Sequence, residues 1–132
     1  MLFIRQRGRT GLAWGMNFDR FTFGLYLRPA KTPALDDERA ATIQDEHLAF
    51  LADLGRSGQL VAAGPFDDQD DPTLRGAMVF STGVAEARSL LSQDPAVRAG
   101  VLSFELMSWL TPAGLVSFHA ARFPESMEEA TG

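Results

Sequence analysis

The chain of 132 residues contains no cysteine, which excludes disulfide bonds, cysteine-ligated zinc, iron–sulfur clusters and thiol nucleophiles. Its two histidines, His47 and His119, do not stand in a spacing typical of a metal site. The apolar runs are only a few residues long, so no segment is suited to cross a bilayer as a helix. The sequence also has no glycine-rich dinucleotide-binding motif. We therefore expect no cofactor, and chemistry that uses His, Asp, Glu, Arg or Tyr.

The overall composition is that of an ordinary globular domain. Apolar residues make up 45% and charged residues 22% of the chain, which argues against disorder. The length suits one domain with a core of its own. The net charge of −5 argues against nucleic acid as the main partner. We expect a soluble, cytoplasmic domain that acts on a small molecule, with no nucleic-acid or membrane partner.

The two ends of the chain differ from its middle. Residues 1–20 carry four arginines against one acid and have no continuous apolar stretch of a secretory signal. We interpret them as a basic leader, either flexible or packed on a partner subunit, and Met16 as a candidate start site. Residues 111–132 form a C-terminal extension. Within it, Thr111–Arg122 is expected to be a short strand or a covering segment, and Phe123–Gly132 an acidic, solvated tail.

Residues 21–110 alternate between strand and helix patterns. Phe21, Phe23, Leu25 and Leu27 recur at every second position, which predicts a strand whose buried face they form. A helix is expected from Asp37 to Arg56, because Asp36 can cap it and Gly55 and Gly58 end it. The other expected elements are strands at 60–63, 76–81 and 101–110, a helix at 84–93 and a short helical turn after Asp94-Pro95.

This order, β-α-β-β-α-β, predicts an α+β fold of the ferredoxin-like type, an antiparallel sheet with both helices on one face. The other face would then lack a cover. In the last strand it would carry Val101, Met107 and Trp109, which is too apolar for bulk water. We expect a second copy of the chain to cover it, as a homodimer with the sheets packed face to face.

His47 and Asp94 are the candidate catalytic pair. His47 lies within the apolar stripe of the first helix, so its ring should point at the sheet and need a hydrogen-bond partner. Asp94 lies at the end of the second helix, on the same side of the sheet, and a carboxylate there would fix the imidazole tautomer for a general base. The alternatives are a satisfied core histidine and an aspartate that only caps a helix.

The remaining candidates are polar or conformationally special residues near strand ends. Tyr26 and Arg28, at the end of the first strand, either hold an anionic substrate or form a solvated face. Gly64-Pro65 should end a strand and shape the nearby cavity. Asp67 and Asp68 begin an acidic loop that lacks the glutamate of a calcium-binding loop.

Three segments resemble the YciI-like (YCII-related) family. They are His47-Leu48-Ala49-Phe50-Leu51, Gly58-Gln59-Leu60-Val61-Ala62-Ala63-Gly64-Pro65 and Gln93-Asp94-Pro95-Ala96-Val97-Arg98-Ala99-Gly100-Val101. They occur in the family's order, and the resemblance extends over about 21–110. It implies a dimeric α/β barrel of ferredoxin-like subunits and a site with a His–Asp pair. The histidine of that pair is carried here onto His47 and the aspartate onto Asp94, with Asp67 and Asp68 as the reserve candidates. Family members include a dehydrochlorinase, and similar folds include muconolactone isomerase and cofactor-free monooxygenases.

Two functional hypotheses follow. In the first, the protein is a cofactor-independent lyase or isomerase in which His47, oriented by Asp94, removes a proton from a small anionic or carbonyl-activated substrate. Arg28, Tyr26, Gly64, Pro65 and Asp67 are its candidate substrate-binding residues. In the second, the protein is a non-catalytic dimer that binds a small ligand, or an accessory subunit of a pathway enzyme. A cavity with converging polar side chains would favour the enzyme.

Overall fold

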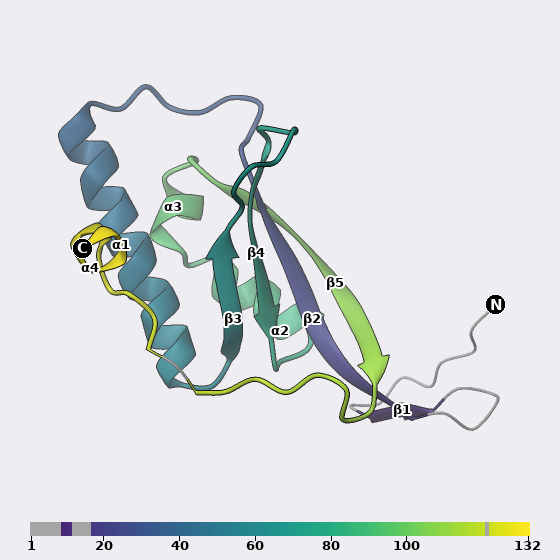
Figure 1. Ribbon diagram of the computed structural model, residues 1–132. Helices are drawn as coiled ribbons and strands as arrows, with labels where there is room; N and C mark the ends of the chain where they lie inside the picture. Colours follow the sequence, from purple (N-terminus) through teal and green to yellow (C-terminus); the bar gives the residue numbers. More distant parts are fainter. Residues whose placement is uncertain (1–8, 12–16, 121) are drawn as a thin grey trace.

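The computed structural model describes residues 9–11, 17–120 and 122–132, which contain five strands and four helices (Figure 1). The strands are β1 (Arg9–Gly11), β2 (Asn17–Leu27), β3 (Leu60–Pro65), β4 (Leu74–Phe80) and β5 (Ser103–Pro112). The helices are α1 (Asp37–Arg56), α2 (Val84–Leu91), α3 (Pro95–Arg98) and α4 (Met127–Thr131).

The strands form one antiparallel sheet with β2 at its centre. β2 pairs with β4 along one edge and with β5 along the other, and β3 pairs with β4, so the spatial order is β3-β4-β2-β5. The short strand β1 pairs with the start of β2. Without β1, the element order and the sheet are those of the ferredoxin-like pattern, so the predicted α+β class is confirmed.

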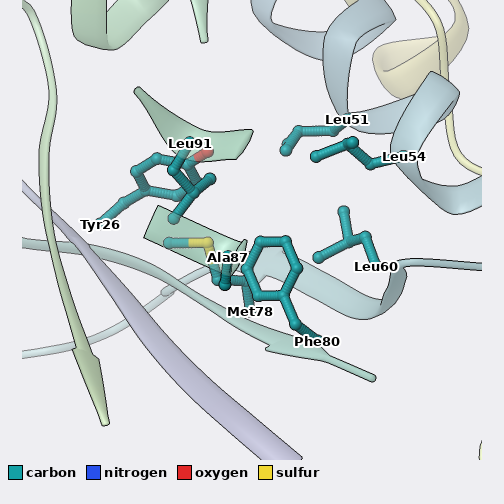
Figure 2. Packing of buried hydrophobic residues seen from close by; sticks show 8 residues of the cluster. All are labelled: Tyr26, Leu51, Leu54, Leu60, Met78, Phe80, Ala87 and Leu91. Carbon is teal, nitrogen blue, oxygen red and sulfur yellow. The ribbon is translucent and has the colours of Figure 1, made fainter. Parts of the chain in front are cut away.

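The hydrophobic core lies between one face of the sheet and helices α1 and α2. Figure 2 shows the cluster, in which side chains of three strands meet those of the two helices: Tyr26, Leu51, Leu54, Leu60, Met78, Phe80, Ala87 and Leu91. α1 begins where predicted, because the Asp36 carboxylate accepts a hydrogen bond from the Arg39 backbone N–H at 2.7 Å. Its buried stripe includes His47, which is thereby turned toward the sheet.

The predicted buried face of β2 is wrong. Thr22, Gly24 and Tyr26 face the core, whereas Phe21, Phe23, Leu25 and Leu27 lie half-buried on the opposite face. The reason lies in the neighbouring strands. A Cβ atom at Gly24 would lie 2.8 Å from the Met78 side chain and 2.9 Å from that of Leu106. Large side chains from β4 and β5 therefore fill the core above β2, and β2 needs a small residue beneath them.

The opposite face of the sheet, which we call the open face, is apolar and aromatic. Direct partners in an antiparallel pair share a face, so Phe23 lies with Met107 and Phe21 with Trp109. Met107 is 41% and Trp109 39% exposed, as expected for an uncovered sheet. Val101, predicted to belong to this strand, precedes β5. From the C-terminal extension, Phe118 packs edge-on against Phe21, with ring centroids 5.3 Å apart.

The chain ends differ from the predictions where the structure describes them. Most of the predicted leader, including Met16, lies outside the described residues. β2 begins at Asn17, inside the stretch assigned to the leader, and β1 also falls within it. At the other end, Thr111–Pro112 continues β5 rather than forming a new strand.

The acidic tail is largely exposed, as expected of a solvated segment. It also returns to α1 and forms α4 there, which was not predicted (Figure 1). The Phe123 side chain packs against the core cluster. The sequence gives little sign of this, because the contacts join residues far apart in the chain.

Candidate active site

His47 and Asp94 meet beneath the helical layer. His47 is 6% exposed, and its Nδ1 atom lies 2.9 Å from Oδ1 and 2.8 Å from Oδ2 of Asp94. Both carboxylate oxygens also accept hydrogen bonds from other donors, so Asp94 is the acceptor and His47 Nδ1–H the donor. In neutral His47 this tautomer leaves the lone pair on Nε2, the nitrogen that a general base would use.

Asp94 is completely buried and is held by three donors. Besides His47, the Tyr26 hydroxyl donates to Oδ2 at 2.6 Å and the Ala96 backbone N–H donates to Oδ1 at 2.9 Å. The last bond makes Asp94 the N-cap of α3, whose first residue is Pro95. The two interpretations of Asp94, helix cap and histidine partner, therefore hold together: the same carboxylate makes both contacts.

Tyr26 is the third member of the buried polar group, an arrangement that the sequence did not predict. Its ring packs edge-on against the His47 imidazole, with centroids 5.3 Å apart. Burial and then the Asp94 carboxylate raise the pKa of the Tyr26 phenol far above its usual value, so the hydroxyl remains a donor at neutral pH. Tyr26 was expected at a substrate-facing or solvated strand end because the buried face of β2 was assigned wrongly.

A cavity of about 430 Å³ adjoins this polar group, within the range typical of small-ligand sites. Its wall comes from α1, from Tyr26 of β2, from the adjacent ends of β3 and β4, from Leu102 and from the C-terminal extension. The lining residues are Tyr26, Gln44, His47, Leu48, Leu51, Ala63, Gly64, Pro65, Arg75, Gly76, Ala77, Leu102, Phe123, Pro124, Met127, Ala130 and Thr131. No described residue makes a hydrogen bond to His47 Nε2.

Of the remaining residues predicted from the sequence, some line this cavity and others do not. Gly64 and Pro65 line it, at the end of β3. Arg28, Asp67 and Asp68 do not: Arg28 is exposed beyond β2, and the two aspartates are exposed in the loop between β3 and β4. Sequence reasoning missed Arg75 and the C-terminal residues of the lining.

In residues 9–11, 17–120 and 122–132 no group of three or more His, Asp or Glu side chains is arranged to hold a metal ion. None of the helices in the described part of the chain is both long and apolar enough to span a bilayer.

The fold and this site define a small α+β domain of the ferredoxin-like type that carries a buried His–Asp–Tyr group beside a cavity. The sequence model of the YCII-related domain matches residues 22–110, and the chain belongs to that family. Comparison with curated proteins finds no sequence that matches this chain. The family match covers His47, Asp94 and Tyr26 and ends before the C-terminal extension.

Proposed function

We propose that this protein is a cofactor-independent enzyme of the lyase or isomerase type. His47 is its general base, and its substrate is a small organic molecule that is anionic or has a C–H bond activated by a carbonyl group. The observation that supports this best is the His47–Asp94 hydrogen bond on the wall of a cavity, with Nε2 left without a partner among the described residues.

The proposed step is a proton transfer from carbon to nitrogen. His47 Nε2 takes the proton, and the electron pair of the C–H bond moves into the enolate of the substrate. The Asp94 carboxylate stabilises the imidazolium that forms, as it already accepts the Nδ1–H. In an isomerase the imidazolium returns the proton to another carbon. In a lyase the electron pair instead expels an anionic leaving group from the adjacent carbon, and the proton passes to water.

Tyr26 is a positioning residue in this scheme. Its hydroxyl donates to Asp94 at 2.6 Å, so it holds the carboxylate in place and does not reach the substrate through that hydrogen. With both oxygens of Asp94 engaged, rotation of the carboxylate would break several hydrogen bonds at once. The imidazole is thereby held in one orientation, as efficient proton transfer requires.

The open face supports the expectation of a homodimer. Four apolar side chains of β2 share this face with Met107 and Trp109 of β5, and the latter two are about two-fifths exposed. An exposed apolar surface of this kind marks an interaction site in a monomer. A second copy of the chain, with its own sheet, would offer the same surface and cover it symmetrically.

The test is solvent deuterium exchange into small unsaturated acids and lactones, followed by mass spectrometry. We expect His47→Ala to lower the exchange rate by roughly 10²–10⁴-fold. His47→Gln should do the same, because its amide can donate to Asp94 but offers no basic nitrogen. The matched control is His119→Ala, at the other, exposed histidine.

An active His47→Ala variant would overturn the proposal. A second outcome would favour the non-catalytic alternative: compounds bind to the cavity, as seen by NMR, yet none exchanges its protons faster than in buffer. The protein would then be a small-ligand-binding dimer or an accessory subunit.

A further inference from the structure

One wall of the cavity lies outside the family domain. Five residues of the C-terminal extension line it, and we call them the C-terminal wall: Phe123, Pro124, Met127, Ala130 and Thr131. The YCII-related match ends at residue 110, so this wall is built from a part of the chain that the family description does not include. The polar group that faces the cavity, His47 with Tyr26, comes from the family domain.

The C-terminal wall is fixed to α1 by specific contacts. The Phe123 ring sits directly on Gly55, where a Cβ atom would lie 2.3 Å from it, so only glycine permits this approach. The Met127 backbone N–H donates to the Asp45 carboxylate at 2.9 Å, and Arg56 forms an ion pair with Glu125. These contacts hold the C-terminal wall against both ends of the second half of α1, so the wall is a fixed part of the cavity.

The C-terminal wall is mainly apolar. Phe123, Pro124, Met127 and Ala130 are apolar residues that line the cavity, and Met127 is 39% exposed. Leu48, Leu51 and Leu102 continue the apolar surface from the other elements. The cavity therefore joins a polar region at His47 to an apolar region at the C-terminal wall, and flexible methionine suits the second to varied shapes.

We propose that the C-terminal wall determines substrate specificity: it receives an apolar group of the substrate while the activated C–H bond of the same molecule faces His47. This rests on the proposed function for the position of the reacting carbon. It adds that the substrate is amphiphilic, with an alkyl or aryl portion on the side away from its carbonyl or anionic group. Phe123 and Met127 are the specificity-determining residues.

The test uses straight-chain methyl ketones of increasing length, from 2-butanone to 2-octanone, as probes of the full-length protein. Binding is followed by NMR on protein labelled with ¹³C in the methionine methyl groups. The chain has only five methionines, and Met107 on the open face serves as an internal reference for non-specific binding. We expect the Met127 signal to shift, and the dissociation constant to fall about fourfold for each added methylene.

Variants of the extension sharpen the test. Phe123→Ala should reduce the gain in affinity for each added methylene to below about twofold, because the alkyl chain of the ketone loses the surface that it contacts. Leu115→Ala is the matched control: Leu115 belongs to the same extension and is 70% exposed, but it does not line the cavity. It should behave as the wild type does.

Three results would overturn the inference: no ketone binds, the Met107 signal shifts instead of the Met127 signal, or Phe123→Ala keeps the full gain for each methylene. The His47→Gln variant separates this inference from the proposed function. If His47 is not a base, the protein will not accelerate the deuterium exchange described above. The inference about the C-terminal wall would still hold if ketone binding to His47→Gln keeps its dependence on chain length.

Discussion

The two faces of the β-sheet differ in which side chains they bury and which they expose. The face beneath the helices encloses three buried polar side chains, Tyr26, His47 and Asp94, and both Tyr26 and His47 form hydrogen bonds with Asp94. The open face presents large apolar side chains, led by Met107 and Trp109, to its surroundings. The inner face thus buries a small polar group within the hydrophobic core, while the open face leaves large apolar side chains partly exposed.

This difference shows that hydrophobic alternation marks the faces of a strand but does not tell which of them is internal. β2 contributes Tyr26 to the inner face and Phe21 and Phe23 to the outer one. The inner face of a sheet can carry small or polar residues where neighbouring elements supply the apolar volume, and the outer face can be apolar where another molecule is to cover it.

Among substitutions on the inner face, Asp94→Ala should destabilise the protein most. The substitution leaves the Tyr26 hydroxyl, His47 Nδ1–H and Ala96 N–H without their acceptor. We expect the free energy of unfolding to fall by about 3–5 kcal/mol, measured by urea denaturation. Asp67→Ala, which removes an exposed carboxylate, is the control and should change it by less than about 0.5 kcal/mol.

On the open face, Trp109→Glu should weaken the proposed dimer, because it places a charge on the apolar surface that the second copy would cover. We expect the dimer dissociation constant to rise by at least about thirtyfold, equivalent to about 2 kcal/mol, measured by analytical ultracentrifugation. Ala85→Glu adds the same charge to the exposed surface of α2 and should leave the assembly unchanged. A wild-type protein that sediments as a monomer at high concentration would refute the homodimer.

The smallest effect concerns the alkaline stability of the inner face. Because the pKa of Tyr26 is raised in the folded protein, its stabilisation is complete below the pKa of an unfolded tyrosine, about 10, and is lost as the pH rises above that value. Relative to Tyr26→Phe, the wild type should lose about 1.4 kcal/mol for each pH unit above 10.

Tyr26 is the only tyrosine, so tyrosinate absorbance reports it directly. The native protein should show no tyrosinate at about pH 11, whereas the chain unfolded in urea should ionise near pH 10. Ionisation of the native protein with an ordinary tyrosine pKa would mean that Tyr26 is not enclosed with Asp94.

Much of the fold could be predicted from local signals. The helix at 37–56 has a capping aspartate, an apolar stripe and terminal glycines, and the structure has it at the same bounds. The short helix after Asp94-Pro95 also follows from a local rule, with proline in the first turn. The hypothesis that His47 and Asp94 lie on one side of the sheet needed only the order of the elements, and the two side chains are in contact.

What could not be predicted depends on long-range packing. The inner position of Tyr26 depends on Met78 and Leu106, which fill the space above Gly24 from two other strands. The return of the C-terminal extension depends on a ring at Phe123 that fits a missing side chain at Gly55. No local sequence pattern predicts such a contact, because the contact forms only when two distant segments of the chain pack together.

The carboxylate of Asp94 has a practical consequence for mutational scanning. It both starts α3 and holds His47, so a library selected for protein abundance and one selected for activity would each reject substitutions at this position. Position 94 would then be classified as structural, and its proposed catalytic share would go unnoticed. His47 does not cap a helix, so substitutions at position 47 should lower activity more than abundance, and a comparison of the two libraries should show this.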